Sequence, residues 1–290
     1  MRDESDIFFT KGGRGIGMEP LQKQAGNVAN FRNVDQADEP AYFVPFLDAI
    51  NRLESVQALK RSIAAQLQAQ EGQSILDVGC GIGDAAQTLA ALVGSAGRVV
   101  GVDSSEYLIQ EARRRAEGTG LSVDYRVGDA HQLDFTDQSF DGCRADRVFM
   151  FLEDPRRALT EMIRVTRPGG RIVIYDIDWD GMMADHPDRA LTRKVFHLGC
   201  ESVRHGWMGR QLPALFRENA LGDVTVSPHM IVPDYAFFTR VFRGLLNRAS
   251  ETGVISTSEL SQWWDPLEQA DQQGLFFAAV PGFIISGRKL

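Results

Sequence analysis

The sequence predicts an α/β fold built on one mostly parallel sheet. Short apolar runs of strand length alternate with helical patterns of about ten residues, which is the order expected of βαβ units. A glycine-rich stretch directly follows the first of these runs. The 290 residues, 43% of them hydrophobic, suffice to bury one large core and to carry additional segments.

The chain divides by pattern into a polar arm and one main domain. Residues 1–40 have no sustained period and contain glycines at 12, 13, 15 and 17, so we expect a flexible arm or lid. Residues 41–290 form the main domain. Within it, apolar residues recur every three or four positions over 46–67, which predicts one long amphipathic helix.

The strands and helices of the main domain follow in order. Five runs predict strands: SILDVG, RVVGVD, SVDYRVGD, FDGCRADRV and GRIVIYDID. Helical patterns lie between them at 84–92, 106–117 and 155–165, the last with Asp154 as its N-cap and RPGG as its stop. Two further strands, DVTVSPHMIV and FFAAVPGFIISGRKL, flank a helical stretch at 234–274 that is rich in Phe and Trp. We expect this stretch to be an insertion that acts as a substrate lid.

Charge and composition exclude several classes of partner. The 31 Lys and Arg against 39 Asp and Glu give a net charge of −8, with no long basic block, so we do not expect nucleic acid as the main partner. The start, MRDESDIFF, is charged where a signal peptide would be apolar, and no stretch reaches the roughly 18 apolar residues of a membrane span. The three cysteines are widely spaced, so we expect reduced thiols, no metal site and a cytoplasmic protein.

The glycine-rich stretch, SILDVGCGIGD, indicates a ligand that approaches the backbone. Gly79, Gly81 and Gly83 form G-x-G-x-G, and Asp103 ends the second run twenty positions after Gly83. A dinucleotide site has its third glycine one position later, and the carboxylate of Asp77 would repel a diphosphate but can receive an ammonium group. The pattern therefore favours a nucleoside with an amino-acid tail, and an NAD-dependent oxidoreductase stays as the weaker alternative.

Four segments in this order resemble a known family. LDVGCGIG resembles motif I of class I S-adenosylmethionine-dependent methyltransferases, VVGVDSSEYLIQEA and VGDAHQL resemble the ribose and adenine segments, and FDGCRADRVFMFLEDPRRALTEMIRVTRPGGRIVI resembles the region of the fourth and fifth strands. RQLPALFRENAL and FFAAVPGFIISGRKL are similar to the ubiquinone/menaquinone C-methyltransferase-like, small-molecule branch. The resemblance implies a Rossmann-like, seven-stranded, mostly parallel sheet with helices on both faces, and S-adenosyl-L-methionine as cofactor.

The resemblance also implies which residues bind the cofactor. Asp77 and the backbone of the three glycines would hold the methionine part, and Asp103 would bind both ribose hydroxyls with Ser104 beside it. Asp129 would accept from the adenine amino group, with the Ala130 amide on a ring nitrogen. Arg147, which follows the fourth strand, completes the expected set.

The chain departs from this family where relatives often carry Gln and His. Met150 and Phe151 stand there instead, so that position supplies no acid or base. Methyl transfer is an in-line displacement that needs alignment first, and a base only if the acceptor must lose a proton. We expect any such base among His186 and Asp178 in YDIDWDGMMADHPD, while a purely structural role for both stays open.

Aromatic residues outside the sheet indicate a pocket for a hydrophobic small molecule. The resemblance implies that this acceptor is methylated on oxygen, carbon or nitrogen, and we expect it to belong to specialised metabolism. The aromatic residues are Phe8, Phe9, Tyr42, Phe43, Trp179, Trp207, Phe237, Phe238, Phe242, Trp263 and Trp264. A methyltransferase-fold cyclase or binding module is the alternative. Phe8 and Phe9 could also reach a second copy of the chain and form a homo-oligomer. KGGRGIG at 11–17 lacks the strand and helix that a phosphate loop requires, so we expect it to belong to the arm.

Overall fold

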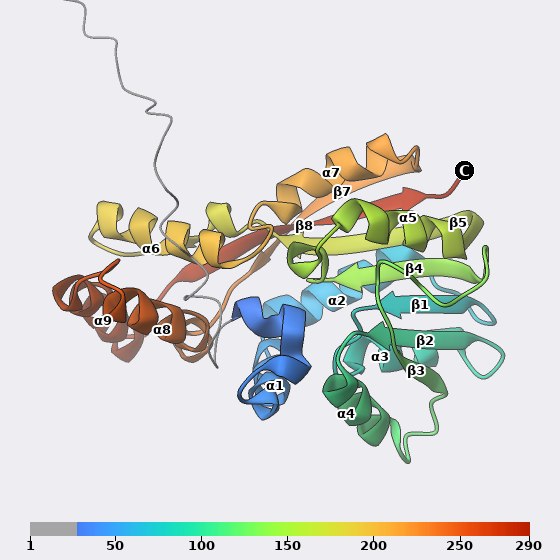
Figure 1. Cartoon of the computed structure of the whole chain (residues 1–290), viewed down its shortest axis with the longest axis horizontal. Helices are drawn as coiled ribbons and strands as arrows, with labels where there is room; N and C mark the ends of the chain where they lie inside the picture. The colour runs from blue at the N-terminus through green and yellow to red at the C-terminus, as the bar shows by residue number, and fades with distance from the viewer. Residues whose placement is uncertain (1–27) are drawn as a thin grey trace, which may run out of the picture.

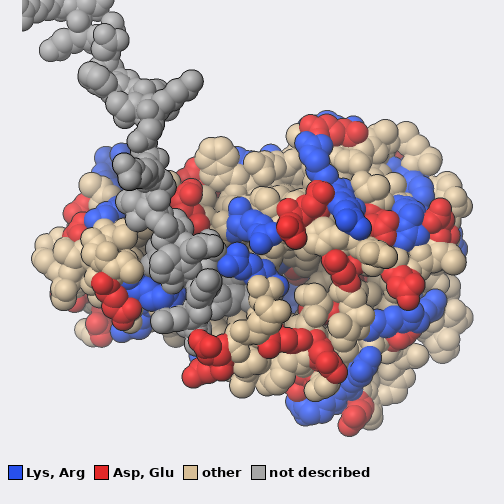
Figure 2. Space-filling view, in the orientation of Figure 1, with Lys and Arg blue, Asp and Glu red and all other residues tan. Residues whose placement is uncertain are grey.

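The computed structural model describes residues 28–290. The glycine-rich segment at 11–17 and both Phe8 and Phe9 therefore lie outside the described residues. No helix within 28–290 combines the length and the apolar character needed to cross a bilayer. On the face drawn in Figure 2, Lys and Arg side chains are interspersed with Asp and Glu side chains.

One mixed sheet runs through the described part of the chain (Figure 1). Its first five strands are parallel, in the order β3-β2-β1-β4-β5, and β8 runs antiparallel to both β5 and β7. The strands are β1 (Ser74–Val78), β2 (Arg98–Asp103), β3 (Val123–Val127), β4 (Phe140–Asp146), β5 (Thr166–Ile177), β6 (Met183–Ala184), β7 (Gly222–Ile231) and β8 (Ala278–Arg288). The predicted seven-stranded α/β fold is confirmed, and the two-residue β6, paired with the start of β8, is an addition.

Helices pack on both faces of this sheet (Figure 1). They include α3 (Asp84–Val93), α4 (Glu106–Ala116), α5 (Pro155–Val165) and α7 (Met208–Glu218). The predicted N-cap of α5 is confirmed, because the Asp154 carboxylate accepts the backbone N–H of Arg157 at 3.0 Å.

The long helix predicted over 46–67 is wrong in one respect, since the chain forms two helices there. They are α1 (Phe43–Asn51) and α2 (Glu54–Leu67), and Leu53 between them is extended, with φ −65° and ψ 127°. The predicted apolar positions are buried on both helices. The three-to-four-residue spacing of the apolar positions therefore continues across the break. Helix α1 faces a cavity, whereas α2 packs on the sheet.

A group of three helices lies at the end of the molecule opposite the C-terminus (Figure 1). It consists of α6 (Arg189–Ser202), α8 (Tyr235–Glu251) and α9 (Thr257–Gln272). Because α8 and α9 connect β7 to β8, the helical insertion predicted at 234–274 is present.

Short 3₁₀ segments complete the surroundings of the sheet edge. They are η2 (Val28–Gln36), η3 (Pro40–Tyr42), η4 (Phe149–Phe151) and η5 (Trp179–Gly181). The carboxyl ends of parallel strands meet at one edge of a sheet, which is where open α/β sheets bind ligands. Three of these segments, η2, η4 and η5, contribute side chains to the cavity at that edge.

Candidate active site

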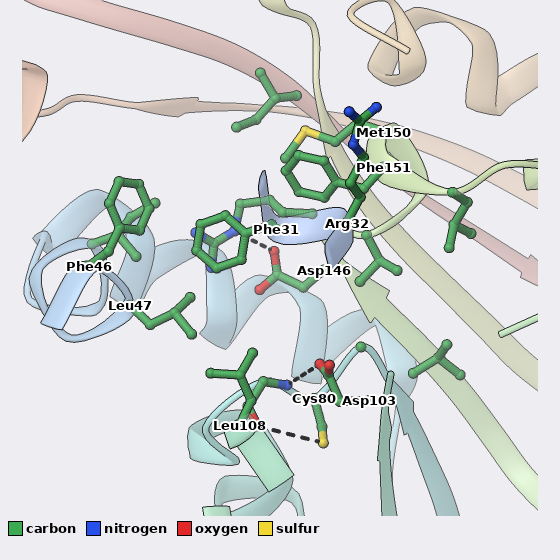
Figure 3. Close-up of a pocket in the computed structure, with 18 of the residues that line it drawn as sticks. Phe31, Arg32, Phe46, Leu47, Cys80, Asp103, Leu108, Asp146, Met150 and Phe151 are labelled. Carbon is green, nitrogen blue, oxygen red and sulfur yellow. Dashed lines mark hydrogen bonds and ion pairs between the residues drawn. The ribbon is translucent and has the colours of Figure 1, made fainter. Parts of the chain in front are cut away.

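A cavity of about 430 Å³ lies at the carboxyl ends of β1, β2, β4 and β5. Loops after these strands form its floor, while η2, α1 and α8 cover it. Figure 3 shows Phe46 of α1 and Phe151 of η4 with Phe31 between them, and the carboxylate of Asp103 below. The cavity therefore has an apolar end and a polar end.

The glycine loop forms the polar end. Gly79 and Gly81 line the cavity with positive φ values of 69° and 53°. A side chain at Gly79 would collide with Val148, whereas a Cβ at Gly81 would meet only Leu47, at 3.5 Å. Gly83 does not line the cavity: it precedes α3 at φ 86°, and its Cβ would overlap the Tyr125 hydroxyl. A ligand can therefore approach the backbone closely at Gly81, whereas Gly83 allows the start of α3 to pack against Tyr125.

The carboxylate of Asp103 fixes the shape of this loop. Its two oxygens accept the backbone N–H groups of Gly81 at 2.9 Å and Ser105 at 3.0 Å. Burial raises the pKa of Asp103, and these two hydrogen bonds act against the shift. Ser104 also lines the cavity.

Asp77 begins a buried chain of alternating charges. Arg144 lies 3.0 Å from Asp77 and 3.1 Å from Asp146, and Arg147 lies 3.0 Å from Asp146. Burial raises the pKa of Asp77 to about 6, although Arg144 lowers it in part. The second carboxylate oxygen of Asp77, Oδ2, has no hydrogen-bond partner. A buried acceptor of this kind in a cavity wall fits a cationic ligand group.

Asp129 and Ala130 line a further part of the polar end. The Asp129 Oδ1 atom accepts the backbone N–H of His131 at 2.9 Å and lies 2.6 Å from the ring Nδ1 of His131. Burial would raise the pKa of Asp129, but these contacts with His131 hold it below its usual value. These contacts favour the ionised form of this exposed carboxylate.

Aromatic and aliphatic side chains form the apolar end, which is continuous with the polar end. They include Phe46, Phe151, Trp179, Phe237, Phe238 and Phe242. The ring centroid of Phe31 lies 5.4 Å from that of Phe46 and 5.9 Å from that of Phe151, so η2 closes this end.

Comparison with known proteins then decides the family. A family model described as "Methyltransferase domain" matches residues 69–220. An uncharacterized 37.1 kDa protein in transposon TN4556 of Streptomyces fradiae is 36% identical over 276 residues, which is 93% of this chain and 78% of that protein. The chain belongs to the methyltransferase domain family. The cofactor of this methyltransferase is S-adenosyl-L-methionine.

Other relatives match a smaller part of the methyltransferase. Sterol 24-C-methyltransferase erg6 of Aspergillus fumigatus is 34% identical over 158 residues, which is 53% of this chain and 40% of that protein. O-methyltransferase resE of Aspergillus sclerotiorum is 32% identical over 167 residues, 57% of this chain and 60% of that protein. The chain thus spans about half the length of these two relatives.

Solved structures share the fold of the methyltransferase. The YcgJ protein of Bacillus subtilis has a TM-score of 0.55 at 19% identity, covering 81% of this chain and 97% of that chain. Phosphoethanolamine N-methyltransferase 2 of Haemonchus contortus, in complex with S-adenosyl-L-methionine, has a TM-score of 0.52 at 18% identity. The match covers 80% of this chain and 52% of that chain. The [4+2]-cyclase SpnF has a TM-score of 0.51 at 22% identity, and the match covers 80% of each chain.

The structure does not bring His186 and Asp178 to the cavity of the methyltransferase. The ring of His186 stacks on Trp263 at 4.7 Å between centroids, and its Nε2 lies 3.2 Å from the carbonyl oxygen of Gln262. Asp178 is buried and forms a double hydrogen bond with the guanidinium of Arg210. Both side chains therefore have structural partners.

Sequence reasoning missed several charged residues of the site, three of them in its polar part. Lys60 of α2 and both Arg144 and Asp146 of β4 line the cavity. The Lys60 Nζ lies 3.7 Å from the Asp84 carboxylate, and burial lowers the pKa of Lys60. The sequence did carry a signal for Arg144 and Asp146, because charged residues in a buried central strand need oppositely charged partners nearby.

The aromatic residues predicted to form a pocket divide into three groups. Trp179, Phe237, Phe238 and Phe242 reach the cavity. Trp263 and Trp264 are buried on α9, and Phe43 is buried in α1. Trp207 is 48% exposed. Three of the four predicted rings that reach the cavity therefore lie on α8.

Proposed function

We propose that this methyltransferase transfers the methyl group of S-adenosyl-L-methionine to a hydrophobic small molecule. The observation that carries the proposal is one continuous cavity, whose polar end carries ionic acceptors and whose apolar end is walled by aromatic rings. One chamber then holds a charged cofactor and an apolar acceptor in contact.

At the polar end, unsatisfied and ionised acceptors support the cofactor assignment. The unpartnered Oδ2 of Asp77 would receive the cofactor's ammonium group, beside Gly79 and Gly81, which line the cavity. Asp103 would bind the ribose hydroxyls with Ser104 beside it, while it keeps its two amide hydrogen bonds.

The remaining expected residues have distinct places in this scheme. Asp129 and the Ala130 amide would meet the adenine ring, because both line the cavity next to Asp103. Arg147 would act through Asp146, to which it is bound, and so support the charge chain that ends at Asp77. We assign Gly83 a packing role, since it lies behind the cavity wall.

The bound cofactor supplies a methyl group activated by its sulfonium. The protein's part is alignment and exclusion of water, because the wall where relatives often carry histidine consists of Met150 and Phe151. His186 and Asp178 are engaged elsewhere, so neither is proposed as the base. We therefore expect an acceptor that needs no protein base, because its oxygen or carbon acid loses its proton to water near neutral pH or its nitrogen is already neutral, such as a carboxylic acid or an acidic phenol or enol.

We extend the proposal to the setting of the enzyme. Specialised metabolism is proposed because an apolar pocket of this kind suits aromatic, polyketide or terpenoid acceptors. A cytoplasmic location is proposed because all three cysteines are free and buried. The lid role of 234–274 is part of the same proposal, and the face of α8 in the cavity supports it.

A screen for methylated products tests the proposed function. The protein would be incubated with S-adenosyl-L-methionine and a panel of apolar phenols, enols and acids, and each product analysed by mass spectrometry. We expect at least one acceptor to gain a methyl group while S-adenosylhomocysteine forms in equal amount, and Asp103→Ala to lose this activity. Tight cofactor binding with no methylated product across the panel would favour a cyclase or binding module, which the lack of an acid or base on the Met150 and Phe151 wall also allows.

A further inference from the structure

We propose that Arg204 binds an anionic group on the acceptor, so that the substrate is an amphipathic molecule with an apolar body and one carboxylate or phosphate. This inference rests on the proposed function, and it assigns a charge to the acceptor that the apolar pocket alone does not imply. Arg204 lines the same cavity as the aromatic rings.

Pairing distinguishes Arg204 from the other cations of the cavity. Lys60 lies beside Asp84, Arg144 and Arg147 are bound to the buried carboxylates, and His131 contacts Asp129. Arg32 also has a partner. Arg204 is exposed and lines the cavity, and it has no hydrogen bond or ion pair with any residue in 28–290.

The backbone directly after Arg204 is fixed to the apolar end. The N–H of His205 donates to the carbonyl oxygen of Met150 at 3.1 Å, and its ring Nε2 lies 3.0 Å from the carbonyl oxygen of Leu152. The next residue, Gly206, accepts the N–H of Trp179 at 2.8 Å. Because Met150, Leu152 and Trp179 all line the cavity, these bonds hold Arg204 at its rim.

The position and chemistry of this side chain determine what it can recognise. A guanidinium presents parallel N–H groups that match two oxygens of a carboxylate or phosphate. At the rim it can bind such a group without full desolvation, while the apolar body of the same molecule enters the cavity. Glu153, which also lines the cavity and has no partner in the described chain, disfavours a second negative group nearby. One anion per acceptor is therefore expected.

A displacement experiment tests this assignment on the full-length protein saturated with S-adenosylhomocysteine. The neutral fluorescent probe N-phenyl-1-naphthylamine would report occupancy of the apolar end. It would be displaced by decanoate, by decyl phosphate and by the uncharged 1-decanol. The variants are Arg204→Gln and, as a matched control, Arg193→Gln, an exposed arginine of α6 that does not line the cavity.

We expect Arg204→Gln to weaken displacement by the better of the two anions about tenfold and to change displacement by 1-decanol less than about twofold. Arg193→Gln should leave all three unchanged, and the ratio of decanoate to decyl phosphate in the wild type tells which anion the site prefers. Equal losses in both variants, or an equal loss for 1-decanol, would overturn the role of Arg204.

If the probe fails to bind, calorimetric titration of the wild type and both variants with decanoate and with 1-decanol tests the role of Arg204 by the same comparison of anion and alcohol. Calorimetry of S-adenosylhomocysteine alone separates the two hypotheses. Normal cofactor binding without discrimination between anion and alcohol refutes only the role of Arg204, whereas absent cofactor binding refutes the proposed function.

Discussion

The affinity for S-adenosylhomocysteine should fall steeply below pH 6, because Asp77 must be ionised to receive the ammonium group. Burial raises the pKa of Asp77 to about 6, so protons compete with the ligand through this range. For a pKa of about 6, roughly one protein in eleven carries the Asp77 carboxylate at pH 5, and nearly all carry it at pH 8. The dissociation constant should therefore rise about elevenfold between pH 8 and pH 5.

Isothermal titration calorimetry of the wild type and of Asp77→Asn over this range measures the effect. The variant should bind more weakly at pH 8 and should lack most of the fall toward pH 5. Asp124→Asn is the control, since Asp124 pairs with Arg98 and Arg126 on the surface and does not line the cavity. A flat wild-type profile, or an unchanged fall in Asp77→Asn, would refute the assignment of Asp77 to the ammonium group. Circular dichroism at each pH confirms that the compared proteins are folded.

Three further perturbations test other parts of the site. Asp103→Ala removes the proposed ribose acceptor and should weaken S-adenosylhomocysteine binding by about 1–3 kcal/mol in the same calorimeter, so near-normal affinity would argue against this placement. Gly79→Ala places a methyl group against Val148 at φ 69° and should lower the thermal midpoint more than Gly118→Ala, which has φ 74° but open space; equal losses would mean that backbone strain alone matters. Asp35→Ala removes the contacts of Asp35 with the Ser105 hydroxyl and the amides of Glu106 and Tyr107, which tie η2 to α4. It should speed ligand dissociation in stopped-flow measurements, and an unchanged rate would show that η2 does not gate the cavity.

Local patterns in the sequence were sufficient to predict the succession of strands and helices along the chain and the ligand-binding loop after the first strand. Glycine spacing and the acid at Asp103 are set within one βαβ unit, where sequence separation is short. The two-residue strand β6 and the break at Leu53 were not predictable, because tertiary packing decides both while the apolar period continues across the break.

Long-range packing explains why the expected base residues are not at the cavity. His186 is held by Trp263 and Gln262 of α9, and Asp178 is held by Arg210 of α7. Nothing within YDIDWDGMMADHPD indicates these partners. The unpaired state of Arg204 likewise becomes visible only when the whole cavity wall is assembled.

Calorimetric titration of the purified protein at pH 8 with S-adenosylhomocysteine, and separately with NAD, tests the central claim most directly. We predict saturable binding of S-adenosylhomocysteine in the micromolar range or tighter, with one ligand per chain and no heat from NAD. Binding of NAD, or of neither ligand, would contradict the assignment of the glycine loop and of Asp77 to a methyl-donor cofactor.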